Sequence, residues 1–362
     1  EQAAALRAWL EADQAPQALV ITCEEQTYAR GLALGLPVAR PVPWDRAQVQ
    51  AYVAGYLDEE KAQRVLLRLL PDEERPALYG LVGFLHHPLL LSVFAHICEI
   101  LPEDITAYSL GFLLEQYVVE LWEQRSAAAT VAFQEVEAGL SVLAYAAVAG
   151  EMPVYLPEAY VQEHVRDPRL LSPENSAAFL EFGGGGVRFI HGLIRYYFAA
   201  LHLMSLEPAA WLQPPLFDPS ENRIPQPLDP VAIIAAGLLP DVATFLERIA
   251  AIDPCLALEC AGSGIQIAGE TYTRLVETAL SAAAAPDSGG RVAALRLLPR
   301  RTLQERLPLL LSVMRNGSWD ARWAAVDTLF DLDLPPAIAV VETLQDFNPG
   351  LRGAAASGLR QI

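Results

Sequence analysis

Apolar residues recur three and four positions apart along most of this chain, the spacing that gives a helix one buried face. Two residues mark helix starts: Asp45, because aspartate caps free backbone N–H groups, and Pro88, because proline suits a first turn. Helices are predicted over 3–13, 44–57, 86–101, 101–122, 133–150, 157–165 and 173–182. The predicted buried face of 101–122 carries Ile105, Tyr108, Phe112, Leu113, Tyr117 and Leu121.

Two segments depart from this helical spacing. Residues 18–23, ALVITC, form a short apolar run that predicts a buried strand, so residues 1–57 look like the end of a parallel α/β domain. Four glycines at 183–186 and the strand at 187–190 predict a hairpin. The helix that follows has a predicted buried face of Ile194, Tyr197, Phe198 and Leu201. Helices followed by a hairpin are typical of a winged-helix domain.

Proline and alanine mark the C-terminal part of the chain. Prolines crowd residues 207–230, which argues against a regular helix and predicts a linker or an extended connection. The segments 289–298, 320–329 and 350–359 each place an Arg before an Ala pair, and those arginines are 31 and 30 residues apart. Such a period predicts stacked helix pairs, an α-solenoid similar to HEAT-type repeats, with one or two degenerate units expected in 229–285.

Composition narrows the classes of partner. The chain has 362 residues, 53% of them hydrophobic, enough for a large core in roughly two to four domains. Its net charge of −19 repels phosphate backbones and it has no Lys/Arg run, so no nucleic-acid partner is expected. Four scattered cysteines fit a reducing compartment, and a cytoplasmic location is expected. No apolar run approaches the ~18–20 residues of a membrane span, so no membrane partner is expected.

Motifs for catalysis or metal binding are scarce in the sequence. The glycines at 183–186 precede neither Lys nor Ser/Thr, and the phosphate-binding pattern GxxxxGK[ST] is absent. The residues His86, His87, His96 and Cys98 match no usual zinc spacing. Cys255 and Cys260 lack a second pair and are interpreted as core thiols.

His191 has a position that allows two interpretations. It follows the predicted strand at 187–190 and opens the next helix. A helix start favours anions through its N–H groups and its dipole, so His191 is a candidate anion ligand. A lone histidine there also commonly serves as a cap or a core residue. The residues alone leave both interpretations open.

Several segments together resemble the NACHT-type STAND NTPases. Phe189 and His191, followed by Tyr197-Phe198-Ala199-Ala200, resemble the F-x-H-x-x-x-x-E-Y-F-A-A segment of that family's winged helix. FLHHPLLLSVFAHI at 84–97 resembles the x-N-P-L-L-L segment of its small helical domain. Residues 101–122, 140–165, 18–31 and 41–57 are similar, respectively, to its next helix, its winged-helix start, its sensor-1 strand and the helix after that strand. The matches occur in family order over residues 16–205.

The resemblance implies a mainly α fold in which an α/β remnant of a P-loop NTPase domain precedes a helical bundle, a winged helix and a HEAT-like α-solenoid. The implied parts are 1–58 for the nucleotide-binding remnant, 59–125 for the small helical domain, 126–206 for the winged helix, 207–230 for the Pro-rich linker and 231–362 for the solenoid. It also implies bound ADP or ATP, with Mg²⁺ only where a P-loop is present. His191 would bond the β-phosphate of ADP, and Pro88 would pack near the adenine.

The chain departs from the family at several points. Glu24 stands at the sensor-1 Arg position and Tyr196 at the Glu of E-Y-F-A-A. The P-loop and Walker B acid would lie before Glu1, which is not a Met, so the sequence is interpreted as a fragment or as a chain whose start was removed. The chain alone is not expected to hydrolyse ATP. It is either the back half of a larger NTPase or part of a degenerate one.

Two functions follow from these observations. The first is the regulatory part of a signalling NTPase, in which ADP or ATP controls oligomerisation and the HEAT-like repeats act as a sensor or an autoinhibitory arm. Self-association on activation and a protein partner on the solenoid are then expected. The alternative is a nucleotide-free scaffold whose repeats bind a protein. A GxxxxGK[ST] motif upstream would favour the first function.

Overall fold

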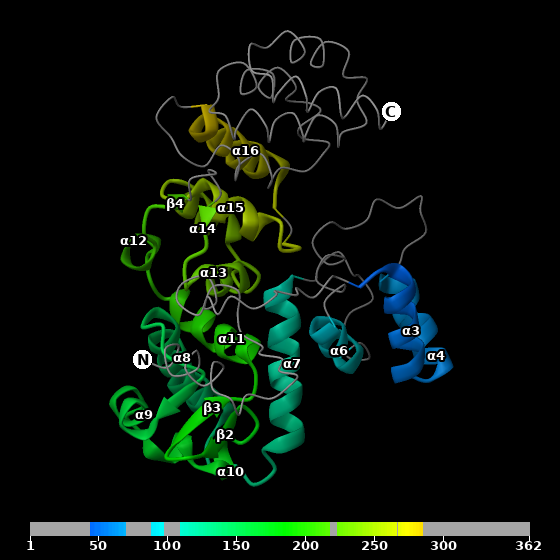
Figure 1. Cartoon of the computed structure of the whole chain (residues 1–362), viewed down its shortest axis with the longest axis vertical. Coiled ribbons are helices and arrows are strands. Elements are labelled where there is room, and N and C mark those ends of the chain that lie inside the picture. The colour runs from blue at the N-terminus through cyan, green and yellow to red at the C-terminus, as the bar shows by residue number, and fades with distance from the viewer. Residues whose placement is uncertain (1–43, 70–87, 98–108, 218–222, 266, 285–362) are drawn as a thin grey trace, which may run out of the picture. The chain divides into compact units, whose positions relative to one another are not determined.

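The computed structural model describes residues 44–69, 88–97, 109–217, 223–265 and 267–284, which fall within one compact unit (Figure 1). These residues are mainly helical, with one three-stranded sheet and one two-stranded ribbon among them. Several predictions fall outside this part of the chain: the helix 3–13, the strand 18–23, the sensor position Glu24 and the repeats at 289–298, 320–329 and 350–359.

The first described helices form a small bundle. They are α3 (Arg46–Tyr56), α4 (Glu59–Leu69) and α6 (Pro88–Ile97), and their shared core also takes Leu113 from α7 (Leu110–Arg125). The predicted start at Asp45 is confirmed, because its side chain accepts a bond from the Gln48 backbone N–H at 2.8 Å. Pro88 is the first described residue of α6. Helix α3, at the end of the segment expected to be α/β, therefore packs with the helices that follow it.

Helix α7 has two buried faces. Leu110, Leu114, Val118 and Leu121 face the larger core of the unit, whereas Leu113 faces the small bundle. The predicted helix 101–122 was too long at its start, because Ser109 caps α7 by accepting the Phe112 backbone N–H at 3.1 Å. The single predicted face mixed residues of both cores, and its members Ile105 and Tyr108 lie outside the described residues.

The first turn of α7 lies directly against the ends of α13 (Asp229–Ala236) and α15 (Pro254–Ala261). The Ser109 hydroxyl donates to the Gly237 carbonyl at 2.8 Å, and the Leu110 N–H donates to the Ser263 carbonyl at 3.4 Å. A Cβ atom on Gly111 would lie only 2.3 Å from the carbonyl oxygen of Ile234. Glycine is therefore required at this close approach. We call this contact the α7 junction.

The three-stranded sheet lies among short helices in the middle of the chain. Its elements are α8 (Phe133–Ala149), β1 (Tyr155–Pro157), α9 (Glu158–His164), a 3₁₀ turn at Pro168–Leu171, α10 (Pro173–Ser176), β2 (Leu180–Gly183), β3 (Gly186–Phe189) and α11 (Gly192–Leu203). The strand order is β1-β3-β2, with both pairs antiparallel. The predicted hairpin is confirmed, since Gly184 and Gly185 turn the chain with φ of 55° and 83°.

The predicted helix 173–182 is wrong beyond its first turn. Helix α10 ends at Ser176, and the chain then enters β2. Leu180 pairs with Phe189 and Phe182 with Val187. Pairing across the glycine turn buries Leu180 and Phe189, an arrangement that the local helical preference of the alanines does not provide.

Helix α11 is the centre of the larger core. It packs on α8, α7, α13 and β3. Ile194, Tyr197 and Phe198 are buried as predicted, while Leu201 is half-buried. The strand β3 leads directly into its N-terminus, so the core of α11 fixes the position of His191.

The Pro-rich segment 207–230 contains short elements of its own. These are the four-residue helix α12 (Pro208–Trp211), which the proline content had argued against, and the ribbon strands β4 (Leu216–Phe217) and β5 (Arg223–Ile224). Proline is compatible with α12 because Pro208 takes its first position, where no N–H bond is lost. Pro208 and Trp211 are both buried.

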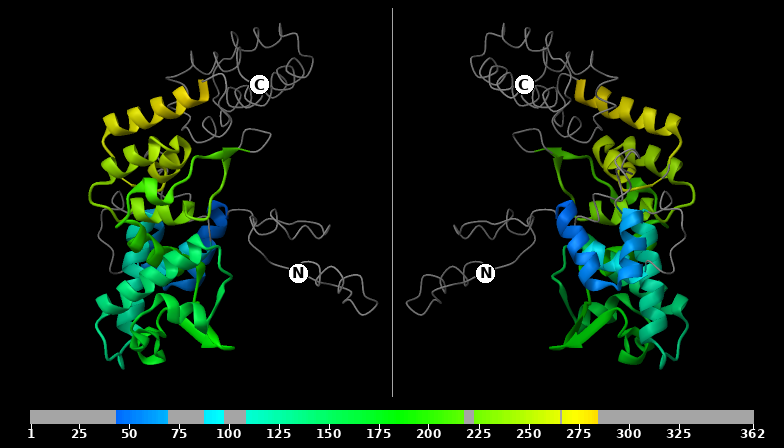
Figure 2. Two further views of the ribbon diagram at one scale, coloured as in Figure 1. Left: turned by 90° about the vertical axis from the view of Figure 1, so that its left-hand side faces the viewer. Right: turned by 90° about the vertical axis from the view of Figure 1, so that its right-hand side faces the viewer.

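Four helices follow this segment and pack in succession (Figure 2). They are α13, α14 (Val242–Ala250), α15 and α16 (Gly269–Ala284). Helix α14 packs on α15 and α15 on α16, while α13 also contacts α15 and α14 contacts α16. None of the helices within the described ranges is long and apolar enough to cross a membrane.

Candidate functional site

His191 lies where the sequence placed it, at the N-cap of α11 directly after β3. Its side chain is exposed, and its Nδ1 accepts the backbone N–H of Leu193 at 3.0 Å. This hydrogen bond confirms that His191 caps α11. Because Nδ1 is the acceptor, a neutral ring in this bond carries its proton on Nε2, which is the tautomer that can donate to an anion.

Arg195 lies one turn further along α11 and shares the face of His191. The residue is only 9% exposed. Its Nη1 donates to the carbonyl of Met152 at 3.5 Å, and its Cζ lies 5.6 Å from the ring centroid of Tyr196. Its Nε is buried and has no hydrogen-bond partner in the described part of the chain.

The loop that carries the Met152 carbonyl is set by the end of α8. Gly150 is the C-cap, the Glu151 N–H bonds the Val148 carbonyl at 3.0 Å, and the Met152 N–H bonds the Ala147 carbonyl at 2.9 Å. This is the Schellman arrangement of a helix end. Glu151 adopts φ of 49°, a left-handed conformation that usually requires glycine. The backbone beside Arg195 is thus held in a defined position.

Pro88, the second predicted site residue, begins α6. Helix α6 packs on α7 beside the small-bundle core, and α11 packs on α7 beside the larger core. The two helices that carry Pro88 and His191 therefore contact α7 through different faces. Helix α7 therefore separates the two helices that carry the predicted site residues.

A second polar contact of α11 joins it to α8. The Tyr197 hydroxyl donates to Glu137 at 3.4 Å. Burial raises the pKa of Glu137, although the bond from Tyr197 acts in the opposite direction. Burial and the nearby Glu137 carboxylate also raise the pKa of Tyr197. Both groups satisfy each other inside the helix interface, so this pair fits a packing role.

A buried ionic cluster, which the sequence did not reveal, joins β5 to α13 and α15. Arg223 donates to Asp229 through Nη1 at 2.5 Å and Nη2 at 2.8 Å, and its Nε donates to Asp253 at 2.6 Å. The three side chains are 4%, 6% and 0% exposed. Burial lowers the pKa of Arg223, but the bonds and charges of the two aspartates outweigh it and the pKa is raised. Asp253 also caps α15 through the Leu256 N–H.

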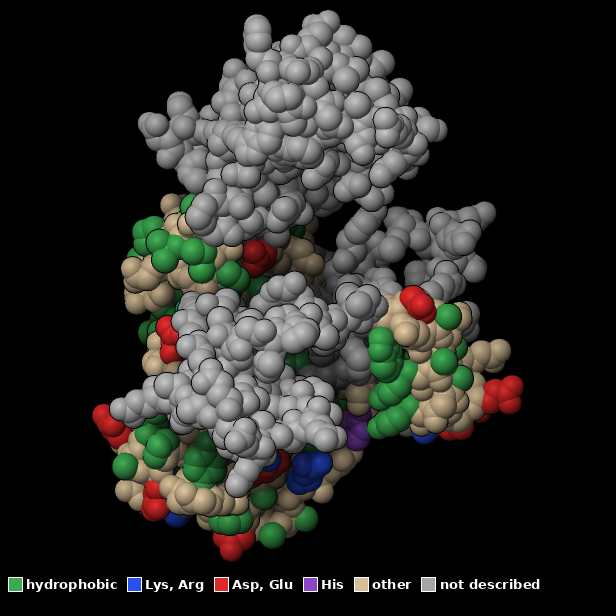
Figure 3. Space-filling view, viewed as in Figure 1, with side chains coloured by type: hydrophobic (Ala, Val, Ile, Leu, Met, Phe, Trp, Pro, Cys, Tyr) green, Lys and Arg blue, Asp and Glu red, His purple; other side chains and the backbone are tan. Residues whose placement is uncertain are grey.

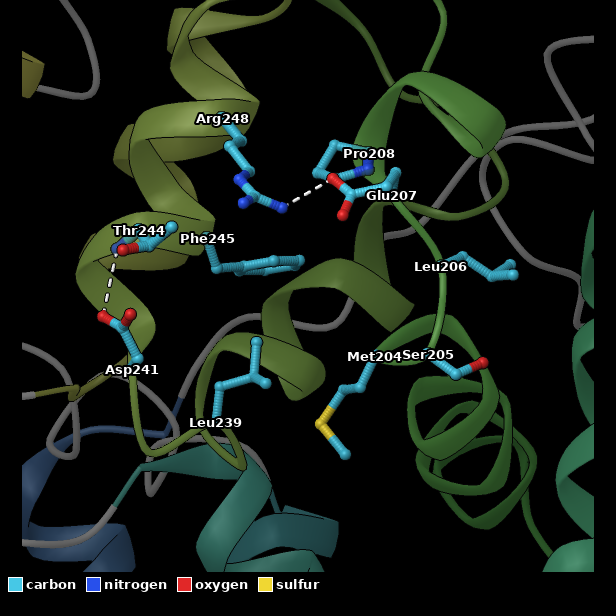
Figure 4. A pocket seen from close by; sticks show the side chains of 10 residues that line it. All are labelled: Met204, Ser205, Leu206, Glu207, Pro208, Leu239, Asp241, Thr244, Phe245 and Arg248. Atoms are coloured by element: carbon cyan, nitrogen blue, oxygen red, sulfur yellow. Dashed lines mark hydrogen bonds and ion pairs between the residues drawn. The ribbon is translucent and has the colours of Figure 1, made fainter.

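A shallow cavity of about 190 Å³ lies at the other end of α11 (Figure 4). Met204, Leu239 and Phe245 supply its apolar side. Glu207 and Arg248 form an ion pair of 2.6 Å beside it. The volume is below the ~300–1,000 Å³ of small-molecule sites. Glu207 and Arg248 pair with each other and Asp241 caps α14 through the Thr244 N–H. Since it also lies at the opposite end of α11 from His191, this cavity is not the site that the sequence predicted.

The described residues offer little support for a metal site or a reactive thiol. Within them, no group of three His, Cys, Asp or Glu side chains is placed to hold a metal ion. Cys255 and Cys260 are buried in α15, which confirms their interpretation as core thiols. Burial raises the pKa of Cys255 to about 12, so this thiol is not activated as a nucleophile.

Charge is scattered over the described part of the face drawn in Figure 3. On the face drawn in Figure 3, acidic and basic side chains alternate with apolar ones and do not merge into one basic patch. Arg188, the exposed arginine of β3, forms an ion pair with Glu181 across the hairpin. The sequence pattern does not single out Arg195. Its burial and its unpartnered Nε become visible only in the fold.

Comparison with protein-family models, with curated proteins and with solved structures finds no match to this chain.

Proposed function

We propose that this chain is the regulatory part of a STAND/NACHT-type signalling NTPase, in which bound ADP or ATP controls self-association. His191 is the proposed phosphate ligand and Pro88 the proposed adenine contact. Mg²⁺ would join only with a P-loop in the same protein. The proposal includes a cytoplasmic location and a protein partner on the HEAT-like repeats.

The observation that carries this proposal is the path of the chain into His191. The order α8, β1, α9, α10, β2, β3, with the sheet order β1-β3-β2, supports the proposed winged helix. The hairpin ends in β3, and His191 then caps the twelve-residue helix α11. An N-terminus of this kind favours a bound anion. A ring that accepts at Nδ1 presents the donor tautomer that a phosphate oxygen needs.

The helices after the winged-helix segment fit the proposed regulatory arm. The packing of α13 on α15 and of α14 on α16 supports the proposed stacked helix pairs. The α7 junction joins these helices to α7, which also packs on the helices that carry Pro88 and His191. A conformational change in these helices could therefore be transmitted to the proposed site through the packing contacts of α7.

Thermal unfolding of the complete protein with ADP and with ATP tests this function. A nucleotide at 100 times its Kd adds about 2.7 kcal/mol of stability, which is a shift of a few degrees in Tm. His191→Ala is expected to lose most of that nucleotide-induced shift. It also removes the cap on Leu193, so its Tm without ligand falls as well.

His191→Asn separates these two effects. Asparagine caps a helix well through its side-chain oxygen, but its amide N–H is carried on a shorter side chain than the imidazole Nε2–H. We expect His191→Asn to unfold near the wild-type Tm without ligand and to lose part of the nucleotide-induced shift, and His191→Asp, which caps but has no donor and repels phosphate, to lose all of it. If neither ADP nor ATP moves the Tm of the wild type, the nucleotide switch is wrong. The scaffold function, supported by the packed pairs α13 to α16, then takes its place.

A further inference from the structure

Two buried arginines in this chain have very different surroundings. Arg223 meets two aspartates through three of its nitrogens. Arg195, 9% exposed, has one long bond to a carbonyl and a ring contact, and no carboxylate lies within ion-pair distance of it in the described part of the chain. Buried charges are normally paired, because an unpaired one costs several kcal/mol. Among the described residues, Arg195 thus lacks the counter-ion that its burial calls for.

We infer that the guanidinium of Arg195 lies toward the N-terminal end of α11. Helical side chains lean toward the N-terminus, so Arg195 extends back over the turn that begins at His191. Its partner Met152 supports this direction. Strands β1 and β3 run antiparallel, so the residues before Tyr155 and those after Phe189 leave the sheet at the same end. The Met152 carbonyl is therefore on the side from which α11 starts.

Among the described residues, the space beside this turn is open. A Cβ atom built on Gly192, the first residue of α11, would meet no atom of those residues within 4 Å. The Arg195–Met152 bond of 3.5 Å is at the long limit for a hydrogen bond, so exchanging it for a stronger acceptor costs little. An anion in this space would meet the helix dipole, the His191 ring and the arginine fork.

We propose that Arg195 is a second anion ligand at the α11 N-terminus and that it binds, with His191, the diphosphate group of the nucleotide. This inference rests on the proposed function and adds a permanent cation to it. An arginine fork matches two phosphate oxygens at once, whereas histidine supplies one donor. The residues select for phosphate groups, so inorganic pyrophosphate should occupy the same place.

The test measures Tm and Kd for ADP and for pyrophosphate on the complete protein. Arg195→Met keeps the length of the side chain and removes its charge. We expect its Tm without ligand to equal or exceed that of the wild type, since an unpaired buried charge is gone. We expect its affinity for ADP and for pyrophosphate to fall about tenfold or more. Arg188→Gln, which removes an exposed charge from the adjacent strand, is the control and should bind as the wild type does.

A second variant keeps the proposal testable if Arg195→Met fails to fold. Gly192→Asp places a carboxylate in the open space, where it favours the helix and repels a phosphate. We expect it to stay folded and to lose the pyrophosphate response.

The possible results separate this inference from the proposed function. If Arg195→Met binds ADP as tightly as the wild type, Arg195 is not a ligand and the nucleotide function stands. A lower Tm without ligand and an unchanged ligand shift would mean that Arg195 only braces the Met152 loop. A response to pyrophosphate but not to nucleotide, lost in Arg195→Met, would keep the anion site and reject the nucleotide switch. No response of the wild type to any of these probes would reject both.

Discussion

At the residue scale, the ionic cluster of Arg223, Asp229 and Asp253 fixes where the Pro-rich segment meets the helices after it. Each nitrogen type of the guanidinium has a carboxylate partner, and the side chains are almost fully buried. The exposed pair of Arg188 and Glu181 offers a natural comparison, since both side chains are about half exposed. Buried pairs are costly to break, whereas exposed pairs contribute little.

Arg223→Met is expected to lower the free energy of unfolding by about 3–5 kcal/mol, because it leaves two aspartates buried without a cation. Arg188→Met should change it by less than about 1 kcal/mol. Urea unfolding followed by circular dichroism measures both values. Equal losses in free energy of unfolding in the two variants would mean that the buried ion pairs of Arg223 contribute no more to stability than the exposed pair of Arg188.

Part of the candidate site was predictable from residues near one another in the sequence. The place of His191 follows from a strand, a polar residue and an amphipathic helix in succession, and the structure agrees. The surroundings of Arg195 and Arg223 were not predictable. Met152 lies 43 residues from Arg195 and Asp253 lies 30 residues from Arg223, and no periodic pattern encodes such contacts.

At the element scale, the α7 junction is a very close contact between helices. Among the helical or helix-flanking glycines of the described chain, Gly111 and Gly237 have the nearest neighbours to an added Cβ atom. Gly111 faces the backbone of α13, and a Cβ atom on Gly237 would lie 2.5 Å from the hydroxyl oxygen of Ser109. The Ile234 oxygen is a backbone atom, and a Cβ on Gly237 would also lie 2.8 Å from the backbone nitrogen of Gly111, so no side-chain rotation relieves either contact. A side chain at either glycine must therefore separate the helices.

Gly111→Ala is expected to destabilise the protein by about 1–3 kcal/mol, since its methyl group overlaps the Ile234 carbonyl oxygen. Gly55→Ala is the matched control, because a Cβ on Gly55, in α3, meets nothing within 4 Å. The control should gain up to about 1 kcal/mol from better helix propensity. Chemical unfolding of both variants gives the comparison, and a neutral Gly111→Ala would contradict the close approach.

Elements with strong local patterns were predicted better than elements that depend on distant partners. Helices α3, α8 and α11 and the glycine hairpin follow from spacing, caps and turn residues. The failures have tertiary causes. Strand β2 replaced a predicted helix because it pairs with β3, and α7 displays two apolar faces because two cores meet on it.

At the scale of the whole molecule, Cys255 and Cys260 report on the opening of the C-terminal helices. Both thiols are buried in α15, at 5% and 0% exposure, and burial raises the pKa of each. In a variant with Cys23 and Cys98 replaced by serine, we expect labelling by a disulfide reagent to proceed only as fast as α15 opens. Adding Gly111→Ala should accelerate it, and rapid labelling in the parent variant would contradict the burial.

The α7 junction also has a consequence for the order in which the protein is made. Ser109 and Gly237 are 128 residues apart, so α7 leaves the ribosome long before the carbonyl that its capping hydroxyl binds. At a synthesis rate of ~5–20 residues per second, the delay is roughly 6–25 s. During that interval α7 has apolar faces without their late partners. The nascent chain is then most exposed to aggregation, and the arrival of α13 ends that period.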